Sequence, residues 1–447
     1  MSKPSLETTL QKELKQALLA TNALTVAFSG GLDSTVLLHL CQRLKVQDSA
    51  LIVNAVHVNH GISANALSWE RHCQDMCDMW HIPIIIKRIS LPTKRRTSLE
   101  QQARVARYAA IEQAVNPTHL TLLAQHQDDQ AETYLLQLAR GAGSEGLSAM
   151  PTQFTSNSGH VFLRPLLKVG RSQLYEYAKR WQLVWIEDES NQDERFYRNF
   201  VRRKIMPALH EKWPAIASTI SRSAEHQAQS VAVVDEYMTF LSHDIVDKDG
   251  QLLIAPWLNL SQESQKAMLR FWLKTRVNDM PSTAVLAQIS DLHRAKDDAQ
   301  PQVKWGDNIV SRYAGKLYVR TKSLCKPHPA FEISLNNEVY SDDVLPYTIQ
   351  RCQQHAPVST HGCFELQSAF LRVEFGGFAR VCKLTAKRPS KSIKKWLQEW
   401  QIPPWERANI PILLAGEQVL AVGKYIALSD ANTQTGPSSF RVCVVLK

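Results

Sequence analysis

The feature that most restricts this 447-residue chain is a glycine-rich hexapeptide, SGGLDS at residues 29–34, between an apolar stretch and a helical one. Residues 23–28 (ALTVAF) read as a buried strand, and the apolar residues at 36, 37, 40 and 44 have helical spacing. Two glycines let the backbone approach a ligand closely, and the N–H groups at the start of a helix favour an anion. The sequence therefore predicts a strand, a phosphate-binding loop and a helix in succession.

Strand and helix signals go on alternating to about residue 190. Further strands are expected at 51–58, 82–89 and 119–124, and helices at 67–81, 98–108 and 128–139. Repeated units of this kind form a parallel, doubly wound α/β sheet of Rossmann-like type, which binds ligands at the carboxyl ends of its strands. We therefore expect polar residues that follow the strands to share one site.

The pattern changes after residue 214. Residues 215–330 combine helical stretches with an alternating, hairpin-like segment at 303–321, and predict a helical or mixed middle domain. Residues 331–364 are rich in Asn, Asp, Pro and Gln and are expected to form a linker with some strand. Short strand signals from 365 predict a small α+β domain at 365–447, so the catalytic domain is expected to span residues 1–214.

Composition excludes several classes of protein. The chain is 44% hydrophobic and 21% charged, as globular proteins are, and it contains no apolar run long enough to span a bilayer and no signal-peptide core. We expect a cytoplasmic protein without a membrane. The eight cysteines form no Cys-x-x-Cys pair and are interpreted as ordinary thiols. The net charge of +10 favours a polyanionic partner without naming it.

The hexapeptide is not a Walker A loop, because no Gly-Lys-Ser/Thr follows it. Asp33 would be unfavourable beside bare phosphate but could hold Mg²⁺, which prefers carboxylate and phosphate oxygens. The hexapeptide resembles the PP-loop of the ATP pyrophosphatase superfamily. That resemblance implies AMP transfer from ATP to a substrate oxygen, with Asp33 as a catalytic residue. It also implies that ATP is bound by Ser29, Gly30, Gly31, Leu32, Asp33 and Ser34.

A second polar group, HQDDQAE at residues 126–132, follows the strand at 119–124. On a helix Asp129 and Glu132 share one face, and carboxylates at a strand end suit a cationic ligand or Mg²⁺. The simpler interpretation is a solvated acidic helix start, which the helix dipole favours. The roles of His60 and His126, both at predicted strand ends, are open between structural and catalytic.

Further motifs narrow the resemblance. They are HVNHG at 57–61, EQQAR at 100–104 with Arg107 and Tyr108, RGAG at 140–143, RPLL at 164–167, EDESN at 187–191 with Arg198 and Arg202, and PPWER at 403–407. In this order they resemble the tRNA(Ile)-lysidine synthetase family in its long, three-domain bacterial form. The match is dense over residues 20–214 and looser over 215–330, and it returns in the last unit around PPWER. Gln125 is a departure, because many members carry a second histidine there.

The resemblance implies a ligase that acts on the wobble cytidine in the CAU anticodon of tRNA(Ile). ATP would adenylate the C2 oxygen of that base, and the side-chain amine of free L-lysine would displace AMP to form lysidine. The resemblance assigns Asp129 and Glu132 to lysine binding and catalysis, because an amine with a pKa of about 10.4 needs help to become nucleophilic. The oligomeric state is open between a monomer and a homodimer.

Three basic clusters support RNA binding. They lie around 94–107, 195–204 and 371–407, where Trp396, Trp400 and Trp405 interleave with the charges. Any one cluster alone would indicate only a solvated surface. The residues expected to contact tRNA or phosphate are Arg104, Arg107, Arg198 and Arg202, and the last two could bind ATP instead of RNA.

Three other functions are disfavoured. A tRNA-thiolating PP-loop enzyme that works on cytidine usually needs Cys-x-x-Cys pairs, which this sequence lacks. An amidotransferase-linked synthetase would need a glutaminase unit with a nucleophilic cysteine, and none is apparent. A catalytically inactive tRNA-binding protein is disfavoured because the loop glycines and serine, Asp33, Asp129 and Glu132 occur together.

Overall fold

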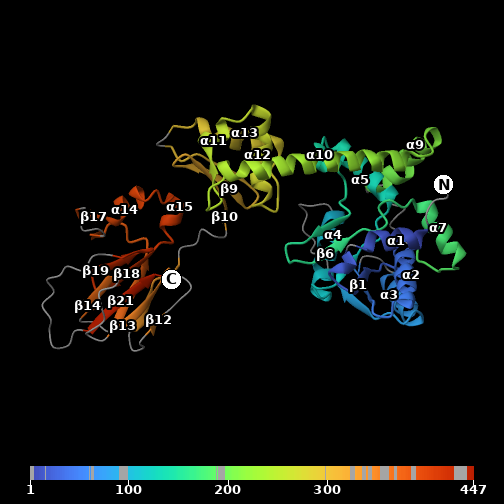
Figure 1. Cartoon of the computed structure of the whole chain (residues 1–447), viewed down its shortest axis with the longest axis horizontal. Coiled ribbons are helices and arrows are strands. Elements are labelled where there is room, and N and C mark those ends of the chain that lie inside the picture. The colour runs from blue at the N-terminus through green and yellow to red at the C-terminus, as the bar shows by residue number, and fades with distance from the viewer. Residues whose placement is uncertain are drawn as a thin grey trace. The chain divides into compact units, whose positions relative to one another are not determined.

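The computed structural model divides the chain into two compact units, residues 1–235 and 236–447 (Figure 1). Each unit contains its own hydrophobic clusters. The structure describes residues 5–15, 17–59, 61, 65–89, 99–187, 189, 197–296, 299–322, 328–334, 339–340, 345–352, 362–366, 370–383, 389–426 and 440–446. No helix in these ranges is long and apolar enough to cross a membrane.

The first unit is built on a six-stranded sheet of order β3-β2-β1-β4-β6-β5. Its strands are β1 (Ala23–Ala27), β2 (Ile52–Asn59), β3 (Ile84–Arg88), β4 (Leu120–Leu122), β5 (Gln153–Thr155) and β6 (Val161–Leu163). All neighbours pair in parallel except β5 with β6. The predicted doubly wound α/β fold is confirmed. The strand order reverses between β1 and β4, which is where sheets of this class form their ligand crevice.

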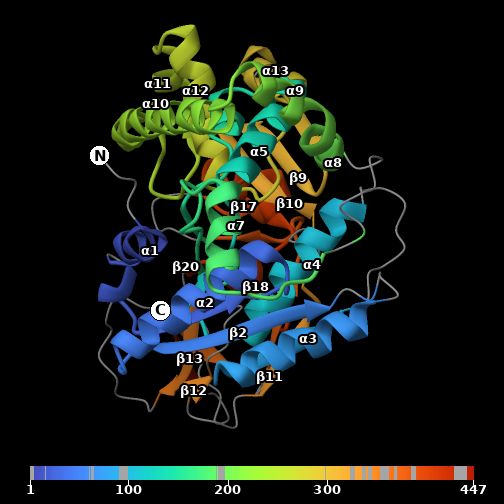
Figure 2. The same cartoon turned by 90° about the vertical axis from the view of Figure 1, so that its right-hand side faces the viewer.

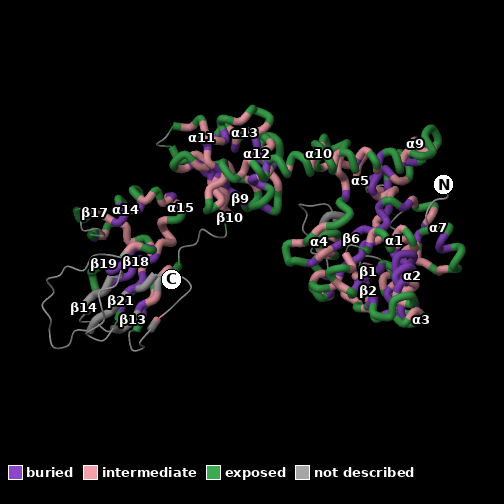
Figure 3. The backbone as a smooth tube through the Cα atoms, viewed as in Figure 1, coloured by how far each residue is buried: buried purple, intermediate pink, exposed green. Residues whose placement is uncertain are grey.

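Helices cover both faces of this sheet (Figure 2). One face packs against α1 (Leu6–Leu14), α2 (Leu32–Gln47), α3 (Ala66–Met79) and α7 (Arg171–Arg180) in one hydrophobic cluster. The other face packs against α4 (Leu99–Ala114) through Ile111 in the helix and Val115 just after its end. Within β1, Leu24 and Val26 point into the first cluster and Ala27 packs against the second, as the two-residue period of a strand requires. Figure 3 shows β1 and α2 as mostly buried.

A smaller group of helices follows β4 and carries several polar residues of the site. It comprises α5 (Gln127–Ala139), α6 (Ser144–Leu147), α8 (Tyr197–Phe200), the π-helical turn η3 (Val201–Ile205), α9 (Met206–Lys212) and the start of α10 (Ile216–Ile245). Ala131 of α5 packs with Val201 and Met206 in a cluster of their own. This contact holds the basic segment 198–204 against the acidic helix α5.

The second unit begins with a mixed part. It contains β7 (Leu252–Leu253), α11 (Ile254–Leu258), α12 (Gln262–Lys274), α13 (Thr283–Asp291), β8 (Gln302–Trp305), β9 (Asn308–Tyr313) and β10 (Lys316–Thr321). The buried side chains of Trp257 and Trp272 lie in its core. The segment 303–321, expected as one hairpin, falls in three strands, because turns with positive φ at Gly306 and Gly315 divide it.

The remainder of the second unit is rich in short strands. One sheet contains β11 (Phe331–Ser334), β15 (Phe370–Phe375), β18 (Pro411–Ala415), β19 (Gln418–Val422) and β20 (Tyr425–Ile426). Another contains β12 (Val339–Tyr340), β13 (Tyr347–Cys352), β21 (Phe440–Leu446) and β14 (Gly362–Leu366). The pair β16 (Val381–Cys382) and β17 (Lys391–Ser392) leads to α14 (Ile393–Glu399) and α15 (Pro404–Arg407). Strands within 331–364 thus belong to the same sheets as the C-terminal strands.

Two tryptophans of this region pack against other parts of the same unit. Trp396 is buried and donates its indole N–H to the carbonyl of Cys382. Trp400 stacks on Tyr425 with ring centroids 3.6 Å apart. Trp396 packs in the core and Trp400 against its edge, although their spacing among basic residues first indicated surfaces for RNA bases.

The two loop glycines provide a matched test of the turn between β1 and α2. Gly30 has φ +81°, and a Cβ there would lie 2.7 Å from Ile186 Cδ1 and 2.9 Å from Cys73 Sγ. At Gly31 the nearest atom to a Cβ would be Ser29 Oγ at 3.6 Å. Gly30→Ala should lower the free energy of unfolding by about 1–3 kcal/mol through strain and overpacking. Gly31→Ala should change it by less than about 1 kcal/mol. Calorimetric melting of both variants checks this, and equal losses would contradict it.

Candidate active site

The glycine-rich loop leads from β1 into α2 at the edge of the crevice. The hydroxyls of Ser29 and Ser34 lie 3.0 Å apart, and Ser34 Oγ donates to the carbonyl of Gly31 at 3.0 Å. These bonds fix the loop beside the first turn of α2. Because the first N–H groups of a helix have no intrahelical partner and carry the positive end of its dipole, this turn can bind a phosphate.

Asp33 lies in that first turn. Its Oδ1 atom is buried and has no hydrogen-bond partner among the described residues. An unpaired buried carboxylate oxygen is costly unless a cation or donor reaches it. The described part of the chain contains no cluster of three or more His, Cys, Asp or Glu side chains that could hold a metal alone. A lone carboxylate beside a phosphate site fits Mg²⁺, which usually keeps waters and phosphates as its other ligands.

His126 connects this loop to the acidic helix that follows β4. It is 2% exposed and caps α5, its Nδ1 accepting from the backbone N–H groups of Asp128 and Asp129. The ring proton therefore lies on Nε2, which is 3.5 Å from Oδ2 of Asp33 and 3.5 Å from Oδ2 of Asp129. One imidazole thus joins the segments that follow β1 and β4, on either side of the switch point.

The charges around His126 determine its proton affinity. Burial opposes a second proton on the ring, but the carboxylates of Asp129, Asp33 and Asp128 outweigh it and raise the pKa of His126. Burial would also raise the pKa of Asp129, but His126, Arg198 and Arg202 together lower it. Asp129 is therefore anionic at neutral pH, in a site that also attracts cations.

Two arginines neutralise the inner carboxylates. Glu132 is 2% exposed and receives two bonds from Arg202, Nε to Oε1 at 2.6 Å and Nη2 to Oε2 at 2.9 Å. Arg198 Nε donates to Oε2 of Glu132 at 3.0 Å. Arg202 Nη2 also donates to Oδ1 of Asp129 at 3.1 Å. The two arginines lie on α8 and η3, and a π-helical turn of this kind is often found at functional sites.

The structure gathers most of the predicted site residues at one sheet edge. Asp33 and Asp129 meet at His126, and Arg198 and Arg202 join Asp129 to Glu132. Oδ2 of Asp128 lies 3.7 Å from Nδ1 of His126 and also accepts from the backbone N–H of Arg171, at the start of α7. Arg104 and Arg107 lie on α4, a different element from the one that carries Asp129 and Glu132. His60, residues 94–96 and Arg195 lie outside the described residues.

Sequence reasoning left the role of His126 open and missed the contribution of Arg164. The contact of His126 with Asp33 becomes visible only when β4 is known to lie beside β1. Arg164 is 2% exposed and its Nε donates to Oε1 of Gln125, the residue before His126. The available signal lies in the motif RPLL at 164–167, where an arginine directly follows an apolar strand.

Three family models match the chain in order. They describe a PP-loop domain at residues 4–209, a TilS substrate binding domain at 252–318 and a TilS substrate C-terminal domain at 371–443. The tRNA(Ile)-lysidine synthase of Salmonella typhimurium is 36% identical over 410 residues, 91% of this chain and 93% of that protein. The chain belongs to the tRNA(Ile)-lysidine synthase family. The enzyme of the same name from Serratia proteamaculans is 35% identical over 434 residues, 97% of this chain and 98% of that protein.

Solved structures add little to this assignment. A U34-tRNA thiolase, NcsA from Methanococcus maripaludis, is 18% identical and covers 49% of this chain and 77% of its own, with a TM-score of 0.42. A TilS C-terminal domain is 19% identical and covers 26% of this chain and 98% of its own, with a TM-score of 0.22. Membership of the tRNA(Ile)-lysidine synthase family confirms the resemblance and makes the chain an ATP-using, tRNA-modifying ligase.

The contact of His126 with Asp33 can be tested separately from its capping of α5. Asparagine can cap a helix and alanine cannot, so His126→Asn should retain about 1 kcal/mol more stability than His126→Ala. Both variants lose the Nε2 contact with Asp33 and should slow tRNA-dependent pyrophosphate release. Calorimetry and a pyrophosphate assay test the two parts. Full activity of His126→Asn would show that the contact with Asp33 is not needed.

The buried ion pairs of Glu132 should differ sharply from a surface pair. Glu132→Gln leaves Arg198 and Arg202 without their main carboxylate and should cost about 2–4 kcal/mol of unfolding free energy. Glu263→Gln is the matched control, because Glu263 and Lys266 are 82% and 66% exposed and their pair contributes less than about 1 kcal/mol. Thermal unfolding distinguishes the two, and equal costs would contradict the role given to Glu132.

Proposed function

We propose that the chain joins free L-lysine to C2 of the wobble cytidine in the CAU anticodon of tRNA(Ile), consuming ATP and releasing AMP and pyrophosphate. The observation that carries this proposal is the meeting of the PP-loop carboxylate Asp33 with the carboxylates of α5 around His126. The proposed reaction needs a carboxylate that can hold Mg²⁺ beside ATP, and it needs carboxylates that bind an amine within reach of that ATP. The family assignment supports the choice of tRNA as the substrate.

In the first step the C2 oxygen of cytidine attacks the α-phosphorus of ATP, the bond to the bridging oxygen breaks, and pyrophosphate leaves. The loop residues 29–34 hold the phosphates through backbone N–H groups and the serine hydroxyls. Asp33 holds Mg²⁺, which supplies positive charge to the phosphate oxygens when it is bound. The free Oδ1 of Asp33 supports this assignment.

In the second step the side-chain nitrogen of lysine attacks C2, and AMP leaves with the former C2 oxygen. Asp129 and Glu132 attract the lysine ammonium, and the Asp129 carboxylate accepts a proton as the amine becomes nucleophilic. Arg198 and Arg202 already neutralise these carboxylates. We infer that the phosphate of the adenylated base draws the two arginines toward itself and frees the carboxylates for lysine. Adenylation would then precede productive lysine binding.

The rest of the chain is assigned to RNA. The family models for substrate binding and C-terminal domains at 252–318 and 371–443 support this assignment. Arg104 and Arg107 on α4 add positive charge to the first unit. Because tRNA and ATP are the substrates, we assign the reaction to the cytoplasm. A homodimer stays a prediction.

The decisive assay combines the full chain, ATP, Mg²⁺, labelled lysine and a CAU-anticodon tRNA(Ile) transcript. Label should enter the RNA, with one AMP per lysine, and should not enter a transcript whose wobble cytidine is replaced by uridine. Asp33→Ala should abolish AMP formation and leave tRNA affinity within about twofold. Asp75→Ala, which removes the same charge from an exposed position on α3, should behave as wild type. No incorporation by wild type would refute the function, and AMP formation by Asp33→Ala would refute the role of the loop.

A further inference from the structure

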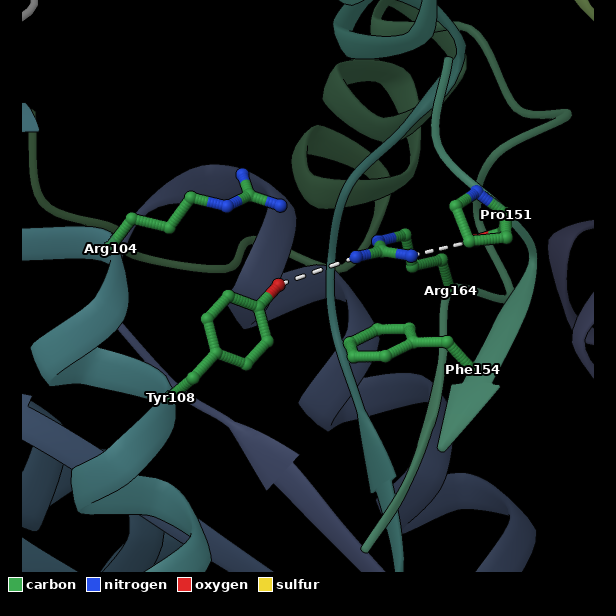
Figure 4. A pocket seen from close by; sticks show the side chains of 5 residues that line it. All are labelled: Arg104, Tyr108, Pro151, Phe154 and Arg164. Atoms are coloured by element: carbon green, nitrogen blue, oxygen red, sulfur yellow. Dashed lines mark hydrogen bonds between the residues drawn. The ribbon is translucent and has the colours of Figure 1, made fainter. Parts of the chain in front are cut away.

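A cavity of about 370 Å³ opens in the first unit between α4 and the segments around β5 and β6 (Figure 4). Arg104 and Tyr108 line it from α4, and Pro151, Phe154 and Arg164 line it from the other side. Arg164 follows β6, which runs parallel to β4, so it lies at the same sheet edge as His126. The bond from Arg164 to Gln125, at 3.0 Å, ties the cavity wall to the residue next to His126.

Arg164 is a buried charge without a counter-ion in the described part of the chain. Besides Gln125, it donates to the carbonyl of Pro151 at 2.7 Å and to the hydroxyl of Tyr108 at 3.3 Å. These bonds use three of the five N–H donors of a guanidinium, and two are left. Burial lowers the pKa of Arg164, and the positive charge of Arg104 lowers it further. No described carboxylate forms an ion pair with either arginine, so an anion in the cavity would be stabilised by both.

The other walls are aromatic and firmly held. Arg164 lies over the ring of Phe154, 4.6 Å from its centroid. Phe154 stacks on the buried Phe162 at 4.9 Å, and Tyr108 packs edge-on against both rings. Fixed aromatic faces beside unpaired guanidinium groups are the combination with which proteins bind unpaired nucleotides: the rings stack on the base and the arginines pair with phosphate.

We propose that this cavity receives the RNA nucleotide that carries the reacting base. The inference rests on the function proposed above and names the place where the base leaves its stack. Its position supports the choice of nucleotide: ATP occupies the β1 side of the switch point, and the cavity lies on the β4–β6 side of the same edge. A base held there is joined to the loop through Gln125 and His126. Tyr108 is its stacking residue and Arg104 pairs with its phosphate, while Phe154, which packs against Arg164 and Phe162, keeps the wall of the cavity in place.

Photocrosslinking tests the occupant directly and needs no turnover. A tRNA(Ile) transcript with 5-iodocytidine at the wobble position should crosslink to Tyr108 or Phe154, as read by peptide mass spectrometry. A transcript with the same base at another anticodon-loop position should not crosslink to these residues. Wobble-position crosslinks that map only to other residues, or equal labelling from the flanking position, would overturn the proposal.

Variants add a second measurement. Arg104 is exposed, so Arg104→Gln should fold normally, and Phe154→Leu retains an apolar side chain of similar size. Each should weaken tRNA binding or raise its KM about five- to a hundredfold, with the affinity for ATP unchanged. Lys179→Gln removes the same charge from an exposed position on α7 and should behave as wild type. If both cavity variants match wild type, the cavity is not the base site. If wild type fails to modify tRNA while the wobble base still crosslinks to the cavity, only the reaction proposed above is wrong.

Discussion

The contact of His126 with Asp33 and Asp129 fixes the glycine-rich loop and the acidic helix α5 beside each other, and the other contacts of the candidate site depend on it. Each partner comes from a different strand end, and the imidazole satisfies a helix cap with one nitrogen while its other nitrogen faces two carboxylates. Four carboxylates, those of Asp33, Asp128, Asp129 and Glu132, lie close to this point, and two guanidinium groups balance them only in part. The surplus of negative charge suits an ammonium group and a magnesium ion, and α5 keeps its start in place because the cap is buried.

Further along the same sheet edge, at the cavity beside Arg164, the local charge is positive instead of negative. Around Arg164 and Arg104 no described carboxylate compensates the positive charge, and aromatic rings replace carboxylates as the walls. Under the proposed function, lysine and RNA would approach one crevice from different sides without competing for the same groups. The parallel sheet makes this possible, because it aligns the ends of β1, β4 and β6 and lets each strand deliver a different chemistry to the same edge.

The sequence predicts the sheet, the glycine-rich loop and the acidic helix because each depends on local pattern: buried strands, paired glycines and carboxylates at helical spacing. It does not predict partners that are remote in the chain. Arg198 meets Glu132 across 66 positions, and its pairing depends on packing between α5 and the turn that follows α8. Trp396 was expected among the side chains available to RNA but is buried, because a run of basic neighbours in the sequence does not show which side chains pack inside. The sequence alone assigned no role to Gln125. In the structure its side chain accepts a hydrogen bond from Arg164.

The π-helical turn at Val201–Ile205 makes the site sensitive to chain length rather than to composition. An ordinary helix advances by about 100° per residue, so a single deletion between Arg198 and Arg202 would turn the second guanidinium away from Glu132 even if every side chain in the segment were kept. Surface loops usually accept such length changes at little cost. Within this family, insertions and deletions should therefore be rarer between these two arginines than in the surrounding connections, and an enzyme redesigned by shortening this segment would lose the alignment of its charges before it lost its fold.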